Sequence, residues 1–404
     1  MNNFLKLKLF FMAIFLSNYL IAQDLRIFGF VQSSFTRYEA KFVPTLNDYT
    51  PPVKVNFMGI NQLNLMASSI LTEDVSTYLN LEFTNNYSSS KGFGYFNLQE
   101  AFIRWDLKDE FKVAFGMLIP SFNSFYEIYN RFPFFPYIAR PKMYETNIEN
   151  VVNLFDILPQ KALFQAYGSL SITELNKIDY ALYFGNPPNS LISSKDNDLL
   201  PGYVAYGQSA SPYLSHGFRI GFSNLFMKFG FSYNGDRDNK TKFIVYDTLD
   251  APNVINLGQH NRYRLGGDFM IKFFDFTISS EIMIVKTTTP KNILDTLKRW
   301  VEINPNYNGR SFDKLGYYVT LQYDYKNMFA FFMLDFLNDD SNRYYFGILG
   351  SKGFNFGIGY YYSENLIIKT QFIHNRGRYN LGLVNIPVRD YREYQYQFGL
   401  SYTF

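Results

Sequence analysis

The last eleven residues of the chain, YQYQFGLSYTF (residues 394–404), alternate between two kinds of side chain. Tyrosine, phenylalanine and leucine occupy one set of positions, and glutamine, glycine, serine and threonine occupy the other. Successive side chains of a β-strand point to opposite faces, so this segment presents one aromatic face and one small polar face. A soluble sheet gives the same alternation. Tyrosine near both ends of the apolar row suits two lipid interfaces, which favours a membrane-spanning strand.

The same alternation recurs along the chain. Residues 225–234 and 262–272 each have an apolar row facing one way, and the charged residues Arg262, Arg264 and Asp268 all fall on the opposite row. Charge confined to one face is the pattern of strands that separate lipid from a hydrated lumen.

Two classes of connection separate these segments. Seven short polar connections predict tight turns, and eight long irregular ones predict loops. The short ones lie at 72–74, 108–110, 174–177, 223–224, 274–275, 326–327 and 363–365, and the long ones at 39–55, 87–95, 120–160, 186–215, 235–260, 287–313, 338–350 and 375–392. The sequence therefore predicts an all-β fold, a transmembrane antiparallel β-barrel of about 16 strands with short periplasmic turns and long extracellular loops. Residues 343–362 fit one long strand or two, and an even strand count favours one.

Composition excludes several classes of protein. The 404 residues include no cysteine and three histidines, with a net charge of +3, so thiolate chemistry and a basic field for nucleic acid are both disfavoured. The sequence has no phosphate-binding glycine loop and no metal-ligand spacing. Ser215 and His216 are adjacent in sequence only, and we read His216 as a lone exposed histidine. We therefore predict no catalytic residues, no metal, no cofactor and no enzymatic activity.

The first residues have the features of an export signal. Residues 1–22 combine Lys6 and Lys8, the apolar run 9–16, and the small residue Ala22, which predicts a signal peptide. Residues 23–404 would then form one barrel domain in the bacterial outer membrane. No later apolar run approaches the roughly 20 residues of a spanning helix, so a closed barrel is the remaining way to satisfy the backbone in lipid.

With these features and a terminal Phe404 on the aromatic row, the chain resembles Gram-negative outer-membrane porins. In those proteins a C-terminal aromatic strand is read by the barrel-assembly machinery, so the resemblance assigns Phe404 and Tyr402 to an assembly signal. Residues 97–103 and 111–117, followed by Pro120, are similar to a strand pair of the phosphate-selective porin O/P type. The resemblance implies a homotrimeric diffusion channel for small hydrophilic solutes, surrounded by outer-membrane lipid and lipopolysaccharide. The dense basic lining of the O/P type has no counterpart here, and residue usage is similar to that of the Bacteroidota.

The long connection 120–160 is the candidate constriction loop, because a loop of this length is more often functional than idle. In porins a loop folded into the lumen and charges on the wall set selectivity. The candidate selectivity residues are Arg131, Arg140 and Lys142 from the loop, and Arg104, Arg219, Arg262, Arg264, Glu100 and Asp268 from the wall. One hypothesis is that these cations face the lumen and favour anions. The alternative is that loop charges meet water outside, while wall charges pair with Glu82, Glu100, Asp268, Glu281 and Asp324.

Other readings stay open. Residues 132–137 (FPFFPY) form either an aromatic path for an apolar or sugar substrate or a proline-braced loop that packs inside the barrel mouth. A plugged-barrel transporter of hydrophobic substrates would need an N-terminal plug, but the first predicted strand, 25–38, begins close to the cleavage point. A barrel enzyme would need a convergent catalytic group, and a secreted β-sandwich would be soluble without detergent. We therefore predict a porin.

Overall fold

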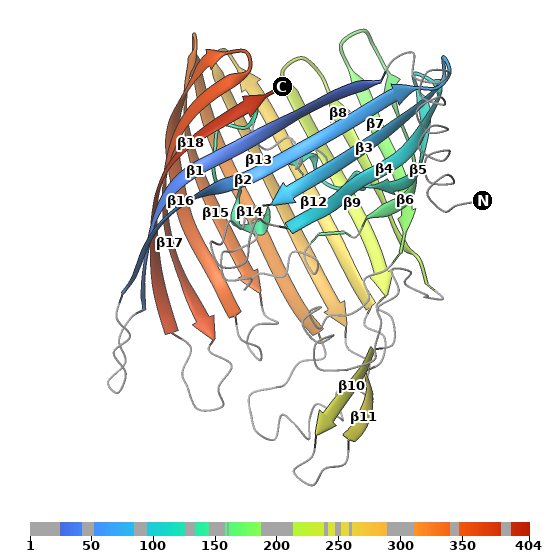
Figure 1. The fold of residues 1–404 in the computed structure, drawn as a ribbon. Coiled ribbons are helices and arrows are strands. Elements are labelled where there is room, and N and C mark those ends of the chain that lie inside the picture. Colours follow the sequence, from blue (N-terminus) through green and yellow to red (C-terminus); the bar gives the residue numbers. More distant parts are fainter. Residues whose placement is uncertain are drawn as a thin grey trace, which may run out of the picture.

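The chain forms a closed barrel of sixteen strands in a computed structural model (Figure 1). The structure describes residues 25–42, 52–84, 95–125, 134–144, 158–159, 161–186, 213–237, 241–246, 252–257, 261–288, 311–339, 347–380 and 389–404. The predicted signal peptide, residues 1–22, lies outside the described residues. Among the described residues, no helix is long and apolar enough to cross a membrane.

The elements are mostly long strands and one short 3₁₀ turn. In chain order they are β1 (Arg26–Phe42), β2 (Val53–Ile70), β3 (Val75–Thr84), β4 (Tyr95–Lys108), β5 (Phe111–Leu118), η2 (Lys142–Tyr144), β6 (Ala162–Ser171), β7 (Lys177–Gly185), β8 (Ser215–Ser223), β9 (Met227–Arg237), β10 (Thr241–Tyr246), β11 (Pro252–Leu257), β12 (Asn261–Phe273), β13 (Phe276–Thr288), β14 (Ser311–Tyr325), β15 (Met328–Asp339), β16 (Gly347–Ser363), β17 (Leu366–Asn380) and β18 (Arg389–Thr403).

Neighbouring strands are antiparallel, and β1 closes the barrel against β18. Closure leaves no sheet edge exposed, which a barrel needs if it is to stand in lipid. The prediction that 235–260 is one irregular loop was wrong. β10 and β11 pair with each other in a separate two-stranded sheet, and β9 pairs directly with β12. The segment TKFIVY (241–246) is rich in β-branched and aromatic residues, which favours a local hairpin where the barrel has no place for another strand.

The two faces of the wall are those that the alternation predicts. In β12, Tyr263 and Leu265 are exposed on the outer face, whereas Arg262, Arg264 and Asp268 are buried on the inner face. In the last strand the aromatic row is exposed, and Gln395 to Ser401 alternate with it as buried residues. Exposed phenylalanine, tyrosine, leucine and isoleucine cover the outside, a surface that suits lipid.

The number and order of the connections follow the prediction, but several predicted loops were too long; residues 375–380 and 389–392 of the predicted loop 375–392, for example, belong to β17 and β18. Seven short turns alternate with eight longer connections around the barrel, and residues 347–363 form one strand. Phe274 and Lys326 begin two of the turns with φ of 48° and 52°, a left-handed conformation that tight hairpins require. The C-terminus lies at the end with the short turns, where Thr403 N donates to Asn365 O at 2.9 Å.

Candidate functional site

The described part of the predicted constriction loop lies inside the barrel. Its backbone and side chains bond to inner-wall residues from strands on different sides of the lumen. The bonds are Asn123 N to Ser232 Oγ (3.0 Å), Phe125 N to Glu281 Oε1 (2.5 Å), Ile138 N to Gln371 Oε1 (2.5 Å), Gln32 Nε2 to Ile138 O (2.9 Å) and Lys369 Nζ to Phe135 O (2.6 Å). Because β9, β13, β17 and β1 each hold it, this loop runs across the lumen.

Two of the predicted selectivity residues belong to these attachments. Lys142 Nζ pairs with Glu393 Oε2 at 3.3 Å, and both side chains are buried, with 8% and 3% exposed. Arg140 donates from Nη2 to Gln62 Oε1 at 2.8 Å. Both cations therefore face the lumen side of the wall, and each is engaged there. Arg131 lies outside the described residues.

A buried tyrosine of η2 anchors the loop to β13. Tyr144 donates its hydroxyl to Glu281, the carboxylate that also accepts from Phe125 N. Burial raises the pKa of the Tyr144 hydroxyl well above its usual value, and the neighbouring Glu281 raises it further. The raised pKa favours the protonated hydroxyl, which is the form that donates to Glu281.

The loop also has an apolar side. Phe125 lies 4.6 Å from the Tyr144 ring, Phe135 stacks on Tyr137 at 5.6 Å, and Tyr137 meets Phe331 of β15 at 5.6 Å. These rings form one buried cluster with inward side chains of β13 to β17: Met283, Val285, Tyr318, Phe329, Phe331, Met333, Leu337 and Ile367. Of the aromatics of 132–137 that the structure describes, Phe135 and Tyr137 pack inside the barrel, as the second reading of that segment expected, whereas Phe134 is exposed.

Sequence reasoning missed this inner apolar cluster. The signal was present in residues 328–334 (MFAFFML), where both alternating rows are apolar. A strand that is apolar on both faces must bury its second face somewhere. Here the inward row of β15 is buried under the loop.

The opposite part of the inner wall is polar and rich in amides. Gln62, Asn64, Asn80 and Glu100 form a chain across β2, β3 and β4, with donor to acceptor distances of 2.8, 2.8 and 3.3 Å. On β18, Gln397 donates to Gln395 at 3.0 Å. Gln62, Asn64 and Asn80 are fully buried, so their amides bond to one another and hold the neighbouring strands of this wall together.

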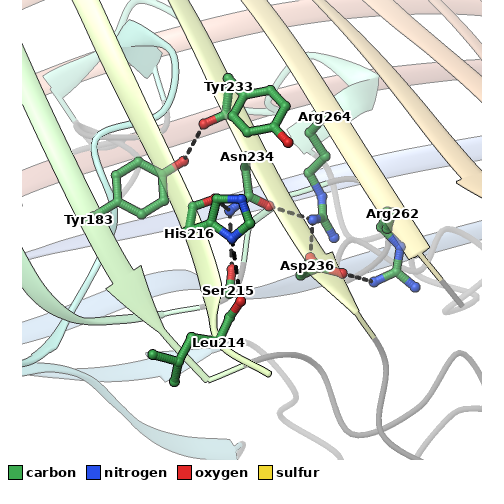
Figure 2. Close-up of polar contacts among 9 residues, drawn as sticks. All are labelled: Tyr183, Leu214, Ser215, His216, Tyr233, Asn234, Asp236, Arg262 and Arg264. Carbon is green, nitrogen blue, oxygen red and sulfur yellow. Dashed lines mark hydrogen bonds and ion pairs between the residues drawn. The ribbon is translucent and has the colours of Figure 1, made fainter. Parts of the chain in front are cut away.

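The predicted wall arginines face inward, and each is paired with a carboxylate. Arg219 forms a two-point ion pair with Asp268, with Nη2 2.8 Å from Oδ1. Figure 2 shows Arg262 and Arg264 reaching the same carboxylate, that of Asp236. Arg264 also donates to Asn234 Oδ1 at 2.6 Å. The alternative expectation was that the wall charges pair with Glu82, Glu100, Asp268, Glu281 and Asp324. Of these five carboxylates, Asp268 is the one that pairs with a predicted wall arginine, Arg219.

The remaining predicted residues lie elsewhere on the wall. Arg104 Nε is 3.1 Å from Asp106 Oδ2, near the short-turn end of β4. Glu100 accepts from Asn80 and from the backbone N of Ile119 at 3.5 Å, where the loop begins. The residues are therefore spread around the lumen, and the structure does not gather them into one ring.

Lys161 was not predicted, although it ends the same long connection. Its Nζ donates to Gln99 Oε1 at 2.6 Å. Burial lowers the pKa of Lys161 to about 8, an effect that Glu100 and Glu82 partly oppose. Lys161 is therefore a lumen-side charge that titrates close to neutral pH.

The predicted assembly residues stand on the lipid face. Phe404 and Tyr402 are exposed, and their rings lie 6.3 Å apart. Phe404 exchanges two backbone hydrogen bonds with Gly29, at 2.9 and 3.0 Å, so the last residue takes part in closing the barrel. Its ring covers Gly29, where a side chain has no room.

Comparisons with known proteins give structural likeness only. No family model matches the chain, and no curated protein matches it. Among solved structures, it is similar to the outer membrane channel DcaP of Acinetobacter baumannii (10% identity, 94% of this chain and 97% of that chain, TM-score 0.55). It is also similar to the anion-selective porin from Comamonas acidovorans (10%, 94% and 99%, TM-score 0.55) and to Salmonella typhi OmpF in complex with daunomycin (9%, 94% and 97%, TM-score 0.53). The shared feature is the barrel fold. In the described residues, no group of three or more histidine, aspartate or glutamate side chains is placed to hold a metal ion.

Proposed function

We propose that the chain is a porin of a bacterial outer membrane, which lets small hydrophilic solutes diffuse down their gradients. The observation that carries the proposal is the loop held across the interior of a sixteen-stranded barrel whose outer face is apolar. Sixteen strands enclose more space than their own side chains fill, and an inward loop reduces that space to a selective path.

The permeation path in this proposal runs along the amide-rich wall. The apolar cluster draws most of its wall residues from β13 to β15, with further members on β5 to β7, β17 and β18, which leaves the wall of β1 to β3 as the polar side. In this proposal the buried amides of Gln62, Asn64 and Asn80 turn from one another toward a passing solute, which regains there the hydrogen bonds that it lost on leaving bulk water. Weak, repeated bonds of this kind favour passage over retention.

The charge preference of this channel is set by few residues. The inward arginines Arg219, Arg262 and Arg264 are paired with Asp268 and Asp236, so they do not form a dense basic lining. Phosphate selectivity of the O/P type stays a hypothesis that these pairs do not favour. A mild anion preference, with Arg140 and Lys161 beside the path, is our proposal. Charge reversal by Arg140→Glu should then shift the reversal potential in the direction of cation selectivity. An unchanged reversal potential would place Arg140 off the path.

A planar bilayer recording tests the central proposal. The detergent-purified mature chain is reconstituted, and conductance and reversal potential are recorded under a KCl gradient. Stepwise, ohmic conductance is expected, and the sign of the reversal potential reports anion or cation preference. A folded barrel that inserts but stays silent would contradict the porin proposal.

The apolar cluster favours a second candidate, a transporter of hydrophobic substrates. Its rings, among them Phe125, Tyr137 and Phe331, pack on one another, and in this candidate an acyl or aromatic group takes the place of some of these contacts. Saturable binding of a fluorescent fatty acid by a silent barrel would support this candidate. A porin instead conducts and does not retain the fatty acid.

The assembly and export proposals come from the resemblance. We propose that residues 1–22 direct export, that the barrel-assembly machinery reads Phe404 and Tyr402, and that the channel is a homotrimer in contact with lipid and lipopolysaccharide. Chemical cross-linking in native membranes is expected to trap three copies. Recovery of monomers alone would contradict the trimer.

A further inference from the structure

Four cations form a straight row on the outer surface of the barrel. Lys352 of β16 is directly opposite Arg376 of β17, Arg376 is opposite Arg392 of β18, and Arg392 is opposite Lys41 of β1. All four side chains are exposed. They belong to adjacent strands (Figure 1), so the row is about 14 Å long at a strand spacing of about 4.8 Å.

The strand alternation places this row on the lipid side. Lys352 shares its face with the exposed Phe356 and Ile358, and Arg392 shares its face with the exposed Tyr396 and Phe398. Lumen residues occupy the other face, including Asn355 and Glu393, which are buried. The four cations therefore point away from the channel.

Like charges placed directly opposite each other destabilise a sheet. Lys41 is compensated by Glu39 at 2.8 Å, and Glu39 also meets Lys54 at 3.5 Å. Within the described part of the chain, Lys352, Arg376 and Arg392 have no carboxylate within ion-pair distance. Arg376 donates only from Nε to His374 Nε2, at 3.1 Å. Among the described residues, these three neighbouring cations have no carboxylate at ion-pair distance, and the nearest acidic residue on the same face of β18 is Asp390, two positions from Arg392.

The surface next to the row fits acyl chains. Two residues further along the strands, Phe354, His374 and Tyr394 are opposite one another, with ring distances of 5.3 and 4.6 Å. The next row is Phe356, Phe372 and Tyr396, with ring distances of 5.2 and 4.9 Å. Cations, then aromatic rings, then aliphatic residues follow in the order of a lipid headgroup, interface and tail.

The row lies at the end of the barrel with the long connections, opposite the C-terminus and the short turns. In an outer membrane that end faces the outer leaflet, whose lipid is a glycolipid with phosphates on its sugars. Other described strands carry far fewer outward cations there; Lys286 of β13 is one.

We propose that this row, Lys352, Arg376, Arg392 and Lys41, binds the sugar phosphates of lipid A, the membrane anchor of lipopolysaccharide. The inference rests on the outer-membrane location proposed above and adds the residues that contact the lipid. Arginine forms two-point hydrogen bonds with phosphate, and two adjacent arginines at the centre of the row offer such bonds to one group. The bound phosphates relieve the repulsion within the row, so lipid stabilises the seam where β18 meets β1.

Binding is measured with fluorescent lipid A in mixed dodecyl maltoside micelles and the refolded mature chain. The double variant Arg376→Glu and Arg392→Glu should weaken lipid A binding by about tenfold or more. It replaces two cations that attract the lipid phosphates with two anions that repel them. Lys286→Glu is the matched control, an outward cation near the same end, and should change binding by less than about twofold. Raised salt should weaken binding to the unaltered chain, since exposed charges are screened.

Lipid A binding tests the lipid site, and bilayer conductance tests the channel proposal. Equal lipid A binding by the double variant and by the control would overturn the inference. Equal binding of phosphatidylglycerol at the same phosphate concentration would also overturn it, since the row would then be a general anionic-lipid surface. Bilayer conductance of the same variants separates this inference from the channel proposal, because the altered side chains face away from the lumen. Normal conductance with unchanged lipid A binding would refute the lipid site alone.

Discussion

Removing the ion pair between Lys142 and Glu393 is the most direct test of whether the inward loop controls the conductance of the channel. Lys142→Met keeps the length and apolar stem of the side chain but removes its charge, leaving Glu393 buried without its ionic partner. Both side chains are almost fully buried, with 8% and 3% exposed. Loss of one partner from such a buried pair costs about 3–5 kcal/mol.

That cost acts on the docked position of the loop. At about 1.4 kcal/mol for each factor of ten, the ratio of undocked to docked loop rises by about two to three and a half orders of magnitude. The remaining bonds, such as Phe125 N to Glu281, still favour docking. We therefore expect brief openings to a larger conductance rather than a permanently wide pore.

Single-channel recording measures the effect directly. Lys314→Met is the matched control, because Lys314 pairs with Asp339 at 2.8 Å and both are buried in the wall between β14 and β15. The control should lower the stability of the barrel without adding large openings. Large openings in Lys142→Met alone support the loop's role. If the two variants give the same conductance records, the reasoning is refuted.

Three further predictions concern assembly, pH and packing. Phe404→Ser should reduce the yield of folded barrel in membranes far more than a matching change at Thr403, as measured by heat-modifiable gel mobility; equal yields would contradict the assembly role. Raising pH from 7 to 9 should shift selectivity toward cations, because Lys161 loses its charge near its lowered pKa of about 8; Lys161→Met should abolish the shift. Between about pH 8 and the ordinary lysine pKa of 10.5, Lys161 has lost its proton in the folded chain but keeps it in the unfolded chain. The free energy of unfolding should therefore rise with pH over this range. Gly359→Ala places a Cβ 2.0 Å from the Phe329 ring and should destabilise the barrel by about 1–3 kcal/mol in urea unfolding; an unchanged midpoint would mean that the ring moves aside freely.

Much of the fold followed from local patterns. Outward Tyr396 and Phe398 and inward Gln395 and Gln397 were assigned correctly, because side-chain direction in a strand depends only on odd or even position. The even strand number followed from the count of seven short and eight long connections. The hairpin of β10 and β11 was missed, since a loop and a short strand pair of this composition differ only in whether a partner is available.

The candidate site was less accessible from the sequence. Arg262 and Arg264 were expected to face the lumen, and they do, but their shared partner Asp236 was not named. The apolar lumen cluster was missed because a transmembrane strand was expected to have one polar face. Phe329 and Phe331 break that expectation, and only the loop that covers them explains why.

The sequence by itself determined the outward face of the strands, the number of barrel strands and the order of short and long connections, because these depend on residues close together in the chain. Only the tertiary structure decided that the long loop turns inward and that four cations align across four strands. Ile138 and Gln371 are 233 residues apart, and their bond exists because the barrel closes. Register between strands is set by closure and by hydrogen bonds across such distances, and no local alternation encodes it.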